Sequence, residues 1–228
     1  MKERVLVSWS GGKDSMMALQ AILSEGRYEV AALLTTVTEP YGRISMHGVR
    51  RSLLERQAEA LGLPLEQVAI TAHPSNSNYE TRMLAALEEW RNRDVQAAVF
   101  GDLFLEDIRH YRESLLANLG MRAVFPLWGQ DSLALARNFT GQGFRAVITC
   151  VDTQTLAGSF AGRDYGEPFL ADLPVGVDPC GENGEFHSFV YSGPLLQRNI
   201  AHRRGEHVLR DGRFMYCDLL PTETDMGR

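Results

Sequence analysis

Six consecutive residues near the start of the chain, SGGKDS at positions 10–15, combine glycine, hydroxyl and ammonium groups. The adjacent Gly11 and Gly12 lack Cβ atoms, so the backbone can turn sharply there and approach a ligand closely. The apolar run 5–7 precedes this turn, and a helical pattern beginning at Met16 follows it. Backbone N–H groups at a helix start lack intrahelical partners and attract anions. The segment therefore predicts a phosphate-binding turn between a strand and a helix.

The lysine of this segment strengthens that interpretation. A cation in the first helical turn is disfavoured by roughly 0.3–1 kcal/mol, and an anion that neutralises Lys13 would explain its presence. The hydroxyl groups of Ser8, Ser10 and Ser15 add hydrogen-bond donors. The spacing differs from the Walker P-loop, which needs four residues between its first glycine and its Gly-Lys pair. We predict that this turn binds ATP; the alternative is an ordinary strand–helix turn capped by Ser10.

The first 128 residues alternate short apolar runs with helical patterns. Strands are expected at residues 5–7, 30–37, 68–70, 97–100 and 123–125, and helices begin near residues 16, 54, 83 and 108. Strands separated by single helices form parallel sheets through right-handed crossovers. The predicted fold class is therefore α/β, with a doubly wound, five-stranded parallel sheet.

Ligands of such sheets bind beyond the carboxyl ends of the strands. Thr36, Gly101 and Asp102 follow or end predicted strands, so we expect them near the glycine turn. Asp14 and Asp102 could bind Mg²⁺, because carboxylate oxygen is a favoured magnesium ligand. The alternatives are that Asp14 simply stabilises a helix start and that Asp102 caps the following helix.

A second, smaller α+β domain is expected over residues 129–228, after an ATP-binding domain over residues 1–128. Glycine, proline and acidic residues become frequent between 152 and 184, and an Asp-Gly pair at 211–212 predicts a hairpin turn. Within this domain, Glu182 and Glu185 precede an apolar strand pattern. Such a pair could hold an ammonium ion, order Mg²⁺ or orient an amine, or it could belong to a polar turn.

Composition limits the remaining possibilities. The chain has 228 residues, 44% of them hydrophobic, and a net charge of −6, which argues against a large nucleic-acid surface. Its three cysteines form no CxxC pair, as expected for reduced thiols in the cytoplasm. No apolar run reaches the roughly 18 residues of a membrane span. The sequence leaves a homodimer open.

Several segments together resemble the diphthine-ammonia ligase family of PP-loop ATP pyrophosphatases, whose fold is HUP-like. Beside SGGKDS they are MHGVRRSLLERQAEALGLPL (46–65), FGDLFLEDIRHYRE (100–113), FPLWGQD (125–131) and DPCGENGEFHSFVYSGPL (178–195). The resemblance implies a PP-loop ATPase domain and a smaller domain that helps to form the acceptor pocket. It also implies that a substrate carboxylate attacks the α-phosphate of ATP, pyrophosphate leaves, and ammonia displaces AMP.

Residue roles follow from this resemblance and its chemistry. Lys13, the turn N–H groups and Mg²⁺ would stabilise the charge on departing pyrophosphate, with Asp14, Glu182 and Glu185 as the other catalytic candidates. His47 resembles a family position beside the nucleotide, whereas Asn183 and His187 depart from the family pattern, which leaves the acceptor open. Residue 2 is not the cysteine of many glutaminases, so free ammonia is the expected donor. Two alternatives are a sulfur-transferring tRNA-modifying enzyme and a nucleotide-binding module without chemistry.

Overall fold

The computed structural model describes residues 2–71 and 75–223. These residues divide into two compact units. The first comprises the chain up to residue 10 together with 14–45 and 63–129, and the second comprises 11–13, 46–62 and the chain from 130 onwards. The expected domain boundary after residue 128 stays a prediction. Among the described residues, no helix has the length and apolar character needed to span a membrane.

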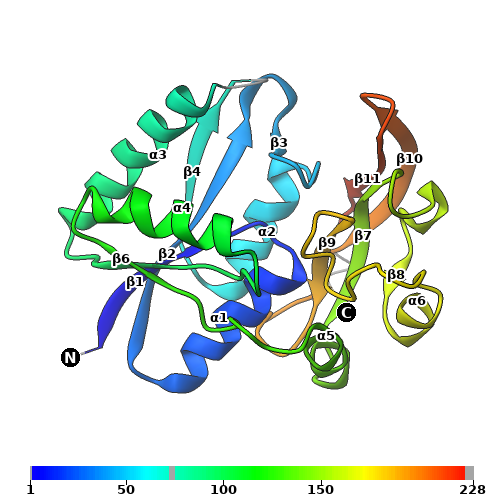
Figure 1. The fold of residues 1–228 in the computed structure, drawn as a ribbon, viewed down its shortest axis with the longest axis horizontal. Coiled ribbons are helices and arrows are strands. Elements are labelled where there is room, and N and C mark those ends of the chain that lie inside the picture. The colour runs from blue at the N-terminus through cyan, green and yellow to red at the C-terminus, as the bar shows by residue number, and fades with distance from the viewer. Residues whose placement is uncertain (1, 72–74, 224–228) are drawn as a thin grey trace. The chain divides into compact units, whose positions relative to one another are not determined.

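The first unit is built on a sheet whose strands are mainly parallel. Five parallel strands are arranged in the order β4-β2-β1-β5-β6, which confirms the predicted doubly wound sheet (Figure 1). They are β1 (Glu3–Ser8), β2 (Tyr28–Thr38), β4 (Leu65–Ile70), β5 (Ala97–Val99) and β6 (Arg122–Val124). A sixth strand, β3 (Arg43–Ile44), pairs antiparallel with β2. Two residues are too few to produce a recognisable pattern, so the sequence did not predict β3.

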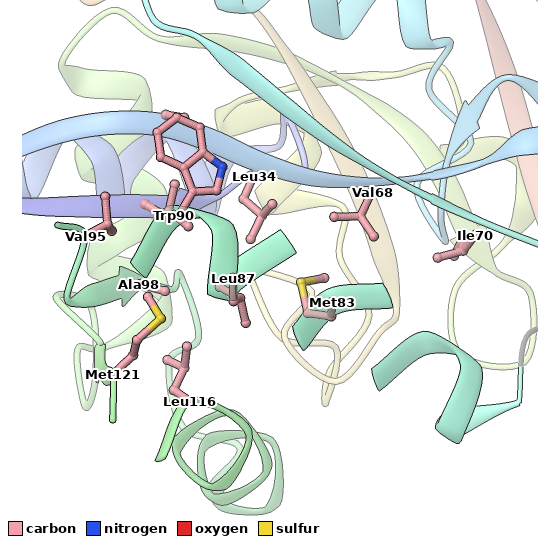
Figure 2. Packing of buried hydrophobic residues seen from close by; sticks show 12 residues of the cluster. Leu34, Val68, Ile70, Met83, Leu87, Trp90, Val95, Ala98, Leu116 and Met121 are labelled. Carbon is pink, nitrogen blue, oxygen red and sulfur yellow. The ribbon is translucent and has the colours of Figure 1, made fainter. Parts of the chain in front are cut away.

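One face of this sheet is covered by α3 (Asn76–Arg91) and α4 (Glu106–Ala117). Figure 2 shows Met83, Leu87 and Trp90 of α3 in one cluster with residues of the sheet and with Leu116 of α4. The spacing of these α3 residues places them on one side of the helix. Burial of this stripe, rather than the polar remainder of α3, therefore fixes the helix against the sheet.

The helix α1 (Lys13–Glu25) follows β1 and contributes Met16, Leu19 and Ile22, all fully buried. Val5 and Val7 are also fully buried and alternate along β1 with Leu6, which belongs to the cluster of Figure 2. Successive strand residues point to opposite faces, so β1 is apolar on both, as expected for a covered parallel sheet. The helix begins three residues before the predicted start, which makes Lys13 its first residue.

The second unit contains an antiparallel sheet in which β7 pairs with β8, β9 and β11, and β11 pairs with β10. The strands are β7 (Arg145–Asp152), β8 (Asp164–Tyr165), β9 (Phe186–Ser192), β10 (His202–Arg210) and β11 (Phe214–Pro221). Its helices are α2 (Arg51–Leu61), α5 (Ser132–Gly141) and α6 (Glu167–Ala171). Short 3₁₀ helices lie at Glu39–Tyr41 in the first unit and Gly158–Phe160 in the second. The expected α+β composition is confirmed.

The hairpin between β10 and β11 has the predicted turn. Asp211 and Gly212 have φ angles of 52° and 62°. Positive φ at both central residues is the requirement of a type I′ turn, which matches the twist of the adjoining strands. Local sequence therefore determined this connection.

Candidate active site

The carboxyl ends of β1 and β5 lie side by side at the centre of the parallel sheet. The chain places β2 and β4 on one side of β1, and β5 and β6 on the other, which makes this the point where strand order reverses and where such sheets bind ligands. Ser8 ends β1, and Gly101 and Asp102 follow β5. A Cβ atom on Gly101 would lie 2.8 Å from the backbone C and O atoms of Asp14. The chain therefore needs glycine here to bring the end of β5 against the first turn of α1.

Hydroxyl groups are plentiful in the same part of the first unit. The Oγ atoms of Ser10 and Ser15 are 3.3 Å apart. Thr36 lies near the carboxyl end of β2, where its carbonyl oxygen accepts a hydrogen bond from the backbone N–H of Ser45. Its neighbour Thr35 is 3% exposed, and the Thr35 hydroxyl has no hydrogen-bond partner among the described residues. A buried hydroxyl of this kind can accept or donate a hydrogen bond to a polar ligand.

Asp102 is held by an arginine. A terminal nitrogen of Arg112 donates a hydrogen bond to Asp102 Oδ1 at 3.1 Å, and Arg112 Nε lies 2.8 Å from Oδ2 in an ion pair. The Arg112 guanidinium lies 4.5 Å from the ring centroid of Phe100, which limits its freedom further. The alternative role of Asp102 as a helix cap is wrong, because the residue that caps α4 is Leu105. The carboxylate is thus held in place beyond the carboxyl end of β5.

In the second unit, the glycine turn is attached to β9 through α2. Gly11 has a φ of +77°, and its carbonyl oxygen accepts hydrogen bonds from the Val190 N–H at 2.9 Å and from Gln57 Nε2 at 3.0 Å. Gln57 is fully buried and also donates to the Val190 carbonyl at 2.7 Å. One glutamine therefore fixes the turn to a strand more than a hundred residues away.

Lys13 lies in an enclosure made by the second unit. Its backbone N–H donates to Ser188 Oγ at 3.2 Å, and its Nζ donates to the Cys180 carbonyl. The ammonium group lies 5.7 and 5.6 Å from the ring centroids of Tyr165 and Phe186, and only 3% of the residue is exposed. The sequence argument gave Lys13 an anion as its only partner. That argument was incomplete, because a carbonyl and two aromatic faces also stabilise the cation.

The two predicted carboxylates belong to one turn, residues 178–186. Glu185 is 4% exposed, and its Oε1 accepts hydrogen bonds from the Asp178 N–H and from Asn183 Nδ2, both at 3.0 Å. Its Oε2 is buried and has no hydrogen-bond partner among the described residues. Glu182 donates its backbone N–H to Asp178 Oδ2 at 2.9 Å. Glu185 therefore organises the turn with one oxygen and keeps the other available.

His47 lies beside His187, with 4.2 Å between ring centroids. Burial, the neighbouring His187 and the positive Lys13 together lower the pKa of His47 well below its usual value, and burial followed by Lys13 lowers the pKa of His187 to about 4. Both rings are therefore neutral at pH 7. The Nδ1 atom of His47 is buried without a hydrogen-bond partner among the described residues.

Sequence reasoning missed several residues near the end of the parallel sheet and around Lys13. Gln57, Thr35 and Tyr165 carry no motif of their own, and only three-dimensional contacts reveal them. Ser188 and His187 lie in the segment after Glu185, where His187 was noted as a departure from the family pattern but neither the Ser188–Lys13 contact nor the His187–His47 contact was predicted.

The predicted magnesium ligands are compatible with Mg²⁺ without forming a complete site. Within residues 2–71 and 75–223, no cluster of three or more acidic, histidine or cysteine side chains could hold a metal ion. Magnesium bound with nucleotides uses one or two carboxylates, with phosphates and water completing its shell. Asp102, held beyond the carboxyl end of β5, and Asp14, in the first turn beside Gly101, fit that requirement.

The order of the parallel strands, and the glycine turn with its lysine that connects β1 to α1 along the chain, define a PP-loop nucleotide-binding fold. The chain belongs to the diphthamide synthase family: the family's N-terminal domain matches residues 2–123 and its C-terminal domain matches residues 131–216. The predicted membership is thereby confirmed.

Proteins named diphthine–ammonia ligase resemble this chain along most of its length. The human protein is 25% identical over 231 residues, which cover 90% of this chain and 85% of the human protein. The zebrafish protein is 25% identical over 227 residues, with 90% and 89% covered. The protein of Schizosaccharomyces pombe is 26% identical over 216 residues, which cover 86% of this chain but only 36% of the yeast protein. The chain thus spans about a third of that relative's length.

Proposed function

We propose that this protein is an ATP-dependent ligase that adenylates a carboxylate, releases pyrophosphate and transfers the acyl group to ammonia. The observation that carries the proposal is Lys13 as the first residue of α1, directly after a glycine turn in a family of diphthamide synthases. The relatives are named diphthine–ammonia ligase, and this name describes the joining of an acceptor to ammonia. A sulfur-transferring enzyme is not favoured.

In the first step, a carboxylate oxygen of the acceptor attacks the α-phosphorus of ATP, and the bond to the bridging oxygen of pyrophosphate breaks. Negative charge grows on the departing group, so N–H groups of the turn, Lys13 and the hydroxyls of Ser8, Ser10 and Ser15 would stabilise it. Thr35, with its unpartnered buried hydroxyl, and Thr36 would contact the nucleotide. Mg²⁺, held by Asp14 and Asp102, would neutralise charge on the phosphates.

In the second step, the nitrogen of ammonia attacks the acyl carbon, the carbon–oxygen bond to AMP breaks, and the nitrogen loses a proton. The second unit offers groups suited to this half of the reaction. Glu185 presents a buried carboxylate oxygen without a partner, and His47 presents a neutral ring. We assign Glu182 and Glu185 to the amination step and His47 to contact with the nucleotide.

The decisive experiment is a screen of carboxylate acceptors for release of AMP and pyrophosphate. Diphthine, named in the relatives, belongs in the screen beside small-molecule carboxylates. Lys13→Ala should abolish release, whereas Lys2→Ala, at the chain's other lysine, should leave it unchanged because Lys2 is exposed. Release of ADP, or full activity in Lys13→Ala, would refute the assignment.

The nitrogen donor is tested in the same assay. We expect ammonium to support turnover and glutamine to fail, because free ammonia is the proposed donor. Efficient turnover with glutamine and the purified chain alone would contradict this. Cys150, Cys180 and Cys217 form no disulfide and are buried, which supports a reducing cytoplasm as the place of the reaction.

A further inference from the structure

The enclosure around the Lys13 ammonium group has the chemistry of a site for a small nitrogen cation. The Cys180 carbonyl accepts a hydrogen bond from Lys13 Nζ, and the rings of Tyr165 and Phe186 face the charge at 5.7 and 5.6 Å. Aromatic faces attract cations, most strongly where water is excluded. Tyr165 and Phe186 are 4% and 2% exposed, so this enclosure excludes water.

A carboxylate on the same turn as Cys180 supplies negative charge. Glu185 binds the backbone N–H of Asp178, two residues before Cys180, through Oε1. Its Oε2 is buried and lacks a hydrogen-bond partner among the described residues. A buried carboxylate oxygen is costly to leave unsatisfied, so a ligand with N–H donors would be stabilised at this turn.

The backbone of Lys13 is held independently of its side chain. Its backbone N–H is separately fixed by Ser188 Oγ, and a lysine carries its three donors on a flexible four-carbon stem. A charged phosphate oxygen forms a stronger hydrogen bond with an ammonium group than a neutral carbonyl does. ATP therefore offers Lys13 a better partner than Cys180.

We propose that the place held by the Lys13 ammonium group is the binding site for free ammonium, and that it opens when Lys13 moves to the phosphates of ATP. The inference rests on the proposed function, since it requires Lys13 to bind phosphate. ATP and ammonium then bind in a fixed order, with ATP first. Ammonium is held by the Cys180 carbonyl and the faces of Tyr165 and Phe186, and the negative charge of Glu185 on the same turn favours a cation there.

The site selects a cation that can donate hydrogen bonds. Tetramethylammonium is attracted by aromatic rings but has no N–H group for the Cys180 carbonyl. It therefore tests attraction by the rings without hydrogen bonding, and it should not compete with ammonium. Potassium has similar size but prefers a shell of oxygen ligands, so it should compete weakly.

The test is a titration with ¹⁵N-ammonium in which binding is measured from NMR line broadening. It is carried out on the protein alone and on the protein with Mg²⁺ and the non-cleavable analogue α,β-methylene-ATP. The protein with analogue should bind ammonium at least about 10-fold more tightly than the protein alone. Lys13→Ala should bind it without nucleotide. Phe186→Leu and Glu185→Gln should each weaken binding by about 5- to 30-fold. Phe144→Leu, a matched change of a buried ring outside the enclosure, should not.

The outcomes separate the two proposals. If the analogue binds and ammonium does not, or if tetramethylammonium displaces ammonium, the ammonium site is refuted and the ATP site stands. If the analogue does not bind, the proposed function fails. Ammonium binding by Lys13→Ala that depends on Glu185 would still support the site in that case. Should Phe186→Leu fail to fold, Glu185→Gln decides alone.

Discussion

Gly11 and Gly26 allow the conformational demand of the glycine turn to be separated from its packing. Both have positive φ, +77° and +70°, a conformation that favours glycine. A Cβ atom on Gly11 would lie 2.6 Å from Leu54 Cδ1 and 2.9 Å from Gln57 Oε1, whereas one on Gly26 would meet nothing within 4 Å. Substitution by alanine therefore strains both positions but crowds only the first.

The expected losses of stability differ accordingly. The left-handed conformation costs an alanine about 1–2 kcal/mol, which is the whole effect expected for Gly26→Ala. Crowding in a packed interior adds about 1–3 kcal/mol, so Gly11→Ala should lose about 2–5 kcal/mol. The methyl group of an alanine at position 11 would also displace Gln57, which holds the turn to Val190. Gly11→Ala should therefore lose ATP affinity as well, and Gly26→Ala should keep it.

Urea unfolding of the two variants and the parent measures the stabilities, and calorimetric titration with α,β-methylene-ATP measures the affinities. The difference between the variants is the informative quantity, because the conformational strain is common to both. Equal stabilities, together with native nucleotide affinity in Gly11→Ala, would refute the view that close packing of this turn builds the phosphate site.

Three further predictions concern charge and burial. A double-mutant cycle of Asp102→Ala and Arg112→Ala should give a coupling free energy of about 1 kcal/mol in urea unfolding; a value near zero would contradict the ion pair. Burial and Lys13 lower the pKa of His187 to about 4, so the unfolded chain binds more protons between about pH 6.5 and 4 and stability falls as pH falls across that window. The free energy of unfolding of His187→Gln, measured by urea unfolding, should therefore fall less than that of the parent across this pH window. An equal dependence on pH in the two proteins would contradict the role of His187. Burial raises the pKa of Cys150 to about 12 and all three cysteines are buried, so a thiol reagent should label the native protein far more slowly than the unfolded one, as followed by mass spectrometry.

Most of the fold could be predicted because its elements are locally encoded. The alternation of apolar runs and helical patterns predicted the five parallel strands, and the Asp211-Gly212 pair predicted the hairpin. β3 and β8 contain two residues each, and their pairing depends on neighbouring strands that no local pattern describes. α6, with five residues, is likewise too short for a helical period.

The candidate site was predictable where a residue ends a predicted strand, as Thr36 does, or where its chemistry conflicts with its position. Lys13 was found because a cation is unfavourable at a helix start, yet its partner Cys180 lies 167 positions away. Gln57 is an unremarkable residue of an amphipathic helix until its amide is seen between Gly11 and Val190. Such contacts depend on long-range packing, which a single sequence does not reveal.

The second unit is built from three separate segments of the chain, and this limits where the chain can be cut to obtain a stable fragment. Residues 46–62 provide Arg50, which pairs with Asp218 at 2.6 Å, and Gly48, where a Cβ would lie 2.5 Å from the Tyr216 ring. A fragment cut out from residue 130 onwards would lack these partners and leave the side chains that meet them facing water. Truncations or chimeras that follow the linear order of the chain would thus divide a cooperative body, and transplanting its specificity requires moving all three pieces together.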